Sequence, residues 1–335
     1  MPYQPPYTLT TLILNEVAAI SEQIGRMTAQ SQQQDLRLRR INRIRTITGS
    51  LAIEGNTLDE AQVTAILDGK RVLAPPREIQ EAHNALQTYE QLPNWKSDAE
   101  QDLLQAHQTL MIGLITEVGQ YRQSGVGVMS GEQVIHVAPP ASQVPRLMKD
   151  LLDWLKHSPD HPLIKSCVFH YEFEFIHPFA DGNGRMGRLW QTLILSEWQS
   201  IFRYIPVESL IHQNQHQYYQ AIQDSTQQTN IVPFIQFMLS MIKQAISHQG
   251  SPQVTPQVNP QVEALLRCIV GEMSREQIQR KLDLRDRKSF NNRYLQPALQ
   301  ADLIEMTIPD KPNSRLQQYR LTAQGKMLQA QGLKP

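Results

Sequence analysis

The 335-residue sequence contains few of the features expected of a secreted, membrane or strongly nucleic-acid-binding protein. Its two cysteines, Cys167 and Cys268, are too few for a disulfide framework and too far apart for a CxxC metal motif, so we expect thiols in a reducing compartment. Lysine plus arginine and aspartate plus glutamate each number 32, so any electrostatic binding site must be local. No apolar run is long enough to cross a bilayer, and the beginning of the sequence lacks the basic start of a signal peptide. We therefore expect a cytoplasmic protein without a membrane partner.

What the sequence does contain is a long series of helical patterns, up to about residue 248. Apolar residues recur at helical spacing in 41–51 and 147–155, and two further helices are predicted at 163–176 and 185–196. The stretch 121–140 breaks this pattern with β-branched residues, a Ser-Gly turn and two adjacent prolines, which predicts a β-hairpin. The first two thirds of the chain are therefore expected to form a helical body that carries one hairpin.

A different organisation follows after residue 250. Three Pro-Gln-Val repeats between 252 and 262 cannot continue a helix and indicate an extended linker. A capping box formed by Ser274 and Gln277 starts a helix. Helices are predicted at 262–270, from 274 and at 287–295. Strands are predicted at 303–308 and 316–321. Three helices followed by a β-ribbon is the order of a winged helix, so we predict a small α+β domain.

The motif HPFADGNGRMGR, residues 177–188, contains the elements of an anion site. Gly182-Asn183-Gly184 lies between two predicted helices, so its backbone N–H groups and the dipole of the second helix can converge on one point. Arg185 and Arg188 project from the same face of that helix, and the arginine fork suits phosphate oxygens. One anion needs one arginine, so the pair indicates a polyphosphate.

Two further residues of this motif suit catalysis on such a ligand. Asp181 supplies a hard oxygen ligand, which is sufficient for Mg²⁺ beside phosphate oxygens. His177 precedes the turn, and the histidine pKa of about 6.5 suits a general base. These residues indicate metal-assisted nucleotidyl or phosphoryl transfer. Two other interpretations stay open: a solvated helix start for GNGR, and a zinc site in HYEFEFIH at 170–177, whose spacing matches no HExxH motif.

HPFADGNGRMGR resembles the Fic signature, HPFx[DE]GNGRxxR, at every defined position, and the resemblance extends over about residues 40–245. It implies an all-α Fic core with a β-hairpin flap and the transfer of AMP from ATP to a Ser, Thr or Tyr hydroxyl of a target protein. By this resemblance His177 is the general base and Asp181 holds Mg²⁺. The implied nucleotide-binding residues are Asp181, Gly182, Asn183, Gly184, Arg185, Met186, Gly187 and Arg188 in the signature, Val134, Ile135, His136 and Val137 in the flap, and the pair Tyr218 and Tyr219.

The stretch SLAIEG, residues 50–55, indicates a built-in inhibitor. Ser50 and Glu54 are four residues apart and share one helix face, and Gly55 is a typical helix stop. The stretch resembles the inhibitory motif [ST]xxxE[GN] of Fic relatives, in which the glutamate pairs with the second signature arginine, here Arg188. The alternatives are a solvated helix end and, as in some relatives, a glutamate that positions water for the removal of AMP.

The predicted organisation has four parts. Residues 1–110 form an N-terminal helical region with the inhibitory helix, 111–248 the Fic catalytic core, 249–262 the linker, and 263–335 the winged-helix domain. The resemblance implies that a target protein docks as a strand on the 121–140 flap.

Two other partners stay open. Basic residues give the region 274–321 a face that could contact DNA, although winged helices also bind proteins and form homodimers. The rival to an enzyme is therefore a regulator that senses a nucleotide and binds DNA through the winged helix.

Overall fold

The computed structural model describes residues 3–30, 36–125, 127–130, 133–250, 260–284, 286–301, 303–308, 314, 316–322, 325–326 and 329. These residues belong to two compact units, Met1–Ser251 and Pro252–Pro335. The predicted fold class, a helical core with a β-hairpin and a small α+β domain, is confirmed. Among the described residues no helix is both long and apolar enough to cross a membrane.

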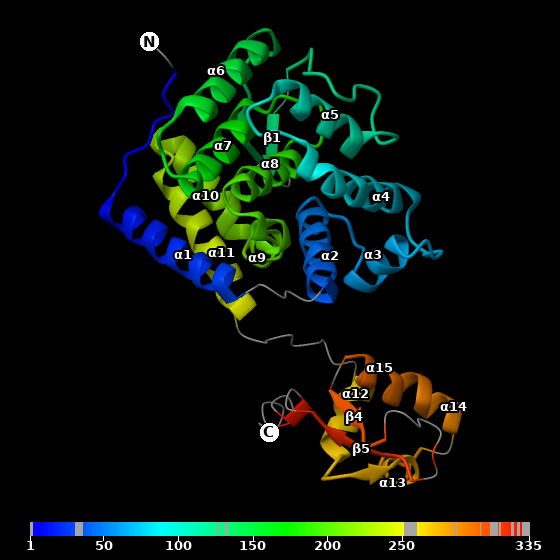
Figure 1. Ribbon diagram of the computed structural model, residues 1–335. Coiled ribbons are helices and arrows are strands. Elements are labelled where there is room, and N and C mark those ends of the chain that lie inside the picture. The colour runs from blue at the N-terminus through cyan, green and yellow to red at the C-terminus, as the bar shows by residue number, and fades with distance from the viewer. Residues whose placement is uncertain are drawn as a thin grey trace. The chain divides into compact units, whose positions relative to one another are not determined.

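The first unit is built almost entirely of helices (Figure 1). In chain order they are α1 Thr11–Gln30, α2 Leu36–Ile53, α3 Glu60–Leu67, α4 Pro76–Gln91, α5 Glu100–Met111, α6 Val144–His157, α7 Pro162–Ile176, α8 Asn183–Trp198, α9 Val207–Gln213, α10 Gln215–Gln228 and α11 Val232–Gly250. Short 3₁₀ turns lie at Leu92–Asn94, Ala141–Gln143 and Ser200–Tyr204. The predicted helices at 163–176 and 185–196 are thus α7 and α8, and the division of this unit at residue 110 stays a prediction.

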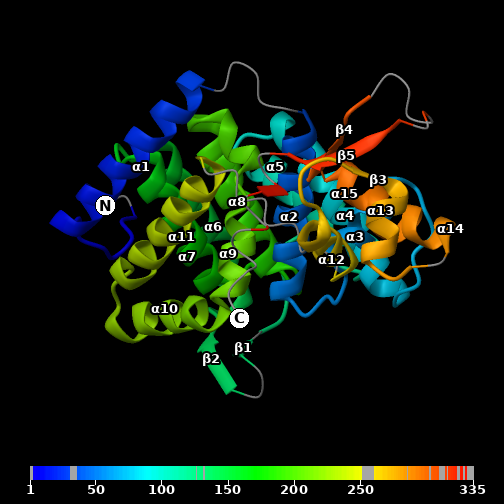
Figure 2. The same ribbon diagram turned by 90° about the horizontal axis from the view of Figure 1, so that it is seen from below.

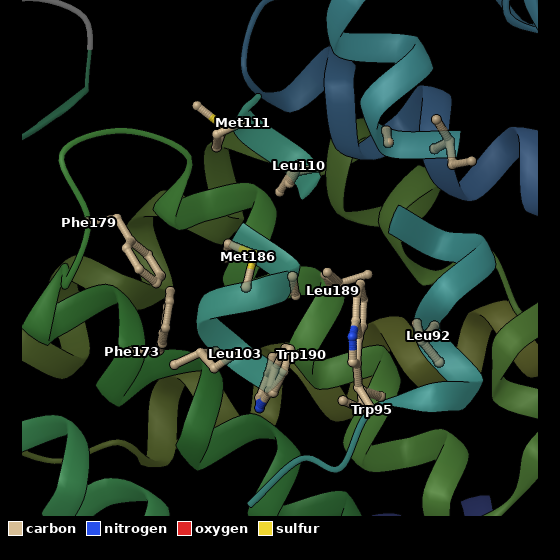
Figure 3. Packing of buried hydrophobic residues seen from close by; sticks show 14 of the residues in the cluster. Leu92, Trp95, Leu103, Leu110, Met111, Phe173, Phe179, Met186, Leu189 and Trp190 are labelled. Carbon is tan, nitrogen blue, oxygen red and sulfur yellow. The ribbon is translucent and has the colours of Figure 1, made fainter. Parts of the chain in front are cut away.

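Helices α7 and α8 form the centre of this unit. Nearly every residue of both helices is buried, as in helices that have packing partners on all sides. One hydrophobic cluster packs α4, α5 and α6 against them, and a second cluster packs α1, α10 and α11. In Figure 3, Phe179 points from the α7–α8 loop toward Phe173, with ring centroids 6.1 Å apart. The core therefore holds the loop that contains the signature.

Helix α2 packs directly against α9. The close approach depends on Gly49, because a Cβ at this position would lie 2.7 Å from the backbone nitrogen of Ser209. The last turn of α2 is further held by Gln215, whose Nε2 donates to the carbonyl of Ile53. The predicted helix stop is also present, since Gly55 follows the helix with a left-handed φ of 88°.

The predicted hairpin consists of β1, Gly127–Ser130, and β2, Gln133–Val137. The strands are antiparallel, with Gly127 opposite Val137, and the register shifts between Val128 and Met129. Figure 2 shows the hairpin extending from the helical body next to α10. For these two strands the structure describes the backbone and not the side chains.

The second unit contains α12 Pro260–Cys268, β3 Met273–Ser274, α13 Arg275–Lys281, α14 Arg287–Phe290, a π-helical turn Asn291–Leu295, α15 Gln296–Gln300, β4 Ile304–Met306 and β5 Gln318–Leu321. The strands form an antiparallel sheet in the order β3-β5-β4. The predicted capping box of Ser274 and Gln277 is present at α13. The winged-helix assignment stays a prediction.

Two boundaries in this unit differ from the predicted ones. Helix α12 begins at Pro260, inside the predicted linker 249–262, because proline is well tolerated at the first position of a helix. Most of the linker lies outside the described residues. The strand β3 was not predicted, since two residues are too short for a periodic pattern.

Candidate active site

The α7–α8 loop holds the signature in a fixed conformation. His177 ends α7 in the left-handed region, with φ 50° and ψ 62°, which costs about 1–2 kcal/mol for a residue other than glycine. Gly182 is also left-handed and precedes α8. The amide of Asn183 closes the loop, because its Oδ1 accepts from the N–H of Phe179 and its Nδ2 donates to the Phe179 carbonyl, both at 2.9 Å. The Asn183 side chain therefore holds the loop, and the nucleotide contact implied for this residue stays a prediction.

The imidazole of His177 is oriented by the end of α7. Its side chain is 19% exposed, and Nδ1 lies 3.4 Å from the carbonyl oxygen of Glu174 and 3.8 Å from Oε2 of the same residue. In the tautomer that has its proton on Nδ1, directed at these oxygens, Nε2 is the proton acceptor of the ring. Burial raises the pKa of Glu174 to about 8, so its carboxyl group is largely protonated at neutral pH.

The zinc interpretation of HYEFEFIH finds no support in the geometry. His170 is fully buried, and its two ring nitrogens contact Oε1 of Gln191 at 2.8 Å and the hydroxyl of Tyr218 at 3.0 Å. Burial lowers the pKa of His170 to about 3, so the ring is neutral. Within the described part of the chain, no group of three His, Cys, Asp or Glu side chains could hold a metal ion.

The second signature arginine forms the ion pair suggested by the inhibitory motif. Arg188 is buried in α8, and its Nη2 lies 2.7 Å from Oε1 of Glu54. The same guanidinium donates to the hydroxyl and the carbonyl of Ser50, each at 3.1 Å. A Cβ at Gly184 would lie only 2.3 Å from Oε1 of Glu54. The Glu54 carboxylate therefore lies against both Arg188 and the N-terminal turn of α8, where an anion is stabilised.

The first signature arginine also lies between carboxylates. Arg185 contacts Oδ1 of Asp181 at 3.3 Å and Oε1 of Glu81 on α4 at 3.4 Å. Oδ2 of Asp181 lies 3.4 Å from Nη2 of Arg77, which is also on α4. Sequence analysis missed Glu81 and Arg77, because their spacing of four residues is common on any solvated helix.

The position and chemistry of the Asp181 carboxylate fit those of a magnesium ligand. Its side chain is 41% exposed and lies beside the α8 N-terminus, and Oδ1 accepts from the N–H of Gly182 at 2.6 Å. A hard carboxylate at the edge of an anion site is the type of ligand that Mg²⁺ takes together with phosphate oxygens.

His107 on α5 supports the loop from outside the signature, and sequence analysis missed it. Its Nδ1 accepts from the N–H of Gly119 at 3.0 Å, so the proton lies on Nε2 and is donated to the Asp181 carbonyl at 3.0 Å. The ring stacks on Phe179, with centroids 3.7 Å apart and planes 3° apart. Burial lowers the pKa of His107 to about 4, which keeps this arrangement neutral.

The remaining predicted nucleotide-binding residues differ in position. The side chain of Met186 is fully buried in the core, and Gly187 packs against α7, where a Cβ would lie 3.0 Å from Oε1 of Glu174. Tyr218 is buried with its hydroxyl on His170, whereas Tyr219 is partly exposed. Val134, Ile135, His136 and Val137 form β2, and their side chains lie outside the described part of the structure. The nucleotide contacts of these residues stay predictions.

Comparison with known proteins gives matches over both units. The Fic/DOC family profile matches residues 92–195, and the profile described as "Filamentation induced by cAMP protein Fic-like, C-terminal domain" matches 260–322. The chain is 30% identical over 209 residues to "Protein adenylyltransferase Fic" of Nematostella vectensis, covering 59% of this chain and 46% of that protein. A protein of the same name from Aedes aegypti is 29% identical over 217 residues, covering 61% and 41%. The chain thus spans less than half the length of these two curated relatives.

One solved structure matches along almost the whole chain. It is the crystal structure of a Fic family protein from Desulfovibrio desulfuricans G20, with 54% sequence identity, a TM-score of 0.73, and coverage of 96% of this chain and 99% of that one. The chain therefore belongs to the Fic family.

Proposed function

We propose that this protein is an autoinhibited protein adenylyltransferase, which transfers AMP from ATP to a Ser, Thr or Tyr hydroxyl of a target protein or of itself. The observation that carries the proposal is one loop that brings a base, a hard carboxylate and an anion site together. His177 ends α7, Asp181 lies in the loop, and the N-terminus of α8 follows with Arg185 and Arg188. The name shared by the curated relatives supports AMP transfer.

The chemistry follows from the positions of these groups. Nε2 of His177 takes the proton of the acceptor hydroxyl, whose oxygen then forms a bond to the α-phosphorus of ATP. The bond between the α-phosphorus and the bridging oxygen to the β-phosphate breaks, and pyrophosphate leaves. Arg185 and Arg188 hold the negative charge of the leaving group. Mg²⁺, held by Asp181 and phosphate oxygens, would neutralise part of the polyphosphate charge.

Autoinhibition is supported by the Glu54 contacts. The carboxylate lies against Arg188 and Gly184, so it competes with a phosphate group for the same donors. Ser50 keeps the guanidinium on α2 through two further hydrogen bonds. ATP that meets this arrangement cannot place its γ-phosphate on Arg188, and its α-phosphate is then not aligned for attack.

The target segment is expected to dock on the flap. Within the described residues the flap sheet consists of β1 and β2 alone, so each strand has one edge without a strand partner. An extended peptide can add to such an edge through backbone hydrogen bonds. This mode would bring a hydroxyl side chain of the target toward His177. Because the hydrogen bonds are made by backbone groups, they would not by themselves select a particular target sequence.

The deciding experiment follows the label of ATP. Glu54→Gly protein is incubated with a bacterial lysate and with either α-³²P-ATP or γ-³²P-ATP, and His177→Ala serves as the inactive control. Protein label from the α-phosphate alone indicates AMP transfer. Label from γ-³²P-ATP would instead indicate phosphate transfer, and no protein label from either nucleotide would refute the proposed function.

A further inference from the structure

Arg122, between α5 and the flap, is a fully buried cation that the signature does not contain. It is 1% exposed, and its side-chain hydrogen bonds to described residues involve no carboxylate. A buried charge is costly unless its donors are satisfied. The partners that satisfy these donors therefore indicate what the residue does.

All of its side-chain hydrogen bonds go to backbone carbonyls. Nε donates to His177 at 2.7 Å, Nη1 to Ser124 at 2.8 Å, and Nη2 to Pro139 at 2.5 Å and Ile176 at 3.3 Å. The backbone N–H of Arg122 also donates to the carbonyl of Pro178 at 2.9 Å. The planar fork of arginine can serve several acceptors in fixed directions, which an ammonium group cannot do.

These carbonyls belong to two parts of the site. Ile176, His177 and Pro178 are the end of α7 and the start of the signature loop. The last carbonyls of a helix have no partner within the helix, and a cation at this end is favourable. Arg122 therefore acts as the cap of α7 at the residue that is the general base, and it favours the left-handed conformation of His177.

The other two carbonyls flank the hairpin. Ser124 comes shortly before β1, which starts at Gly127, and Pro139 comes shortly after β2, which ends at Val137. One guanidinium thus holds both ends of the flap and the backbone of His177 at the same point.

We propose that Arg122 is a positioning residue that couples the flap to the general base. A target strand docked on the flap is held in register with the imidazole because both rest on the same guanidinium. The assignment of a catalytic consequence rests on the proposed function, whereas the mechanical coupling does not. The two signature arginines proposed to hold phosphate, Arg185 and Arg188, lie on α8 and are not among the hydrogen-bond partners of Arg122.

The test replaces Arg122 in the Glu54→Gly background by methionine, which keeps an unbranched apolar stem and removes all donors, and by lysine, which keeps the charge. For Arg122→Met we expect a loss of AMP transfer of about 100-fold, the size expected for a small misplacement of reacting groups. The affinity for ATP should stay within about threefold, because the anion site is intact. Arg122→Lys should recover only part of the rate, since one ammonium cannot reach carbonyls on both sides.

A matched control separates the loss of catalytic positioning from a general loss of stability. Ile242→Ala leaves a cavity in α11, in the second hydrophobic cluster, and lowers stability without touching the loop. Its rate should stay near that of the parent at a temperature where both variants are folded. A rate for Arg122→Met within threefold of the parent, a full rate for Arg122→Lys, or equal losses of ATP affinity and rate would each overturn the proposal.

Amide hydrogen exchange tests the coupling without any enzymatic activity. In Arg122→Met the amides of His177 and of both flap strands should exchange about tenfold faster together, because they lose a common support. In Ile242→Ala these amides should exchange as in the parent. Faster exchange in the flap alone would overturn the coupling. If Glu54→Gly transfers no AMP, the proposed function fails, and the exchange experiment still decides the role of Arg122.

Discussion

The substitution Glu54→Gly tests the inhibitory contact most directly. Arg188 is 1% exposed and the Glu54 side chain 35%, and their charged atoms lie 2.7 Å apart. An exposed pair contributes about 0–1 kcal/mol, whereas breaking a buried pair costs about 3–5 kcal/mol. A pair with one buried and one partly exposed member lies between them, at about 1–3 kcal/mol, and about 1.4 kcal/mol corresponds to a factor of ten. Since ATP must displace Glu54 from Arg188, we expect AMP transfer to rise by about tenfold or more.

The assay is the initial rate of protein labelling by α-³²P-ATP at a subsaturating concentration of ATP. Glu90→Gly serves as the matched control, because Glu90 pairs with Arg43 at the surface and neither residue belongs to the signature loop. The charged atoms of this pair lie 3.6 Å apart. The rate of Glu90→Gly should equal that of the parent. Arg188→Ala should be inactive with either residue at position 54, because the inhibitor and the γ-phosphate use the same guanidinium. A rate for Glu54→Gly no higher than that of the parent, on any protein including itself, would show that this glutamate is only a helix end.

The other expected outcomes concern the base, the metal ligand, the loop and the pH dependence. His177→Ala should lower AMP transfer by at least about 100-fold, as expected for loss of a general base, with ATP affinity unchanged in calorimetry. Asp181→Ala should weaken ATP binding more with Mg²⁺ than without it; an equal loss would indicate a structural role. Gly184→Ala should lower the melting temperature less in the Glu54→Gly background, because its Cβ would lie 2.3 Å from Oε1 of Glu54. Burial raises the pKa of Glu174 from 4.5 to about 8, so the folded state holds a proton that the unfolded chain has lost, and stability falls as pH rises through this window. Glu174→Gln should reduce that fall in thermal unfolding, and an unchanged pH profile would contradict the shifted pKa.

The parts of the fold that the sequence predicted are those with a local signal. Helices α7 and α8 follow from apolar periodicity, and the loop between them follows from the glycines around Asn183. The hairpin follows from β-branched residues between turn signals. The contact of Glu54 with Arg188 joins residues 134 positions apart, and only the resemblance to the Fic family suggested it.

The parts that the sequence did not predict depend on contacts between distant segments. Arg122, His107 and Glu81 are single polar residues in ordinary surroundings, and no spacing relates them to the signature. Their roles come from burial against the loop, which only the packed structure defines. Asn183 shows the opposite case: its motif position was recognised, but its amide holds Phe179.

The contact between Glu54 and Arg188 is also a consequence of how the anion site is built. Arg188 is buried beside the N-terminus of α8, so two sources of positive charge face the same small region. Glu54 supplies a counter-charge to this buried arginine, and removing one partner of a buried pair costs about 3–5 kcal/mol. Glu174 is less suited to this role, because burial raises the pKa of its carboxyl group to about 8. Glu54 is more exposed than Glu174 and pairs with Arg188, and its side chain can leave toward solvent when a phosphate takes its place. The same partial exposure suits the proposed inhibition, in which a phosphate of ATP replaces the carboxylate on Arg188.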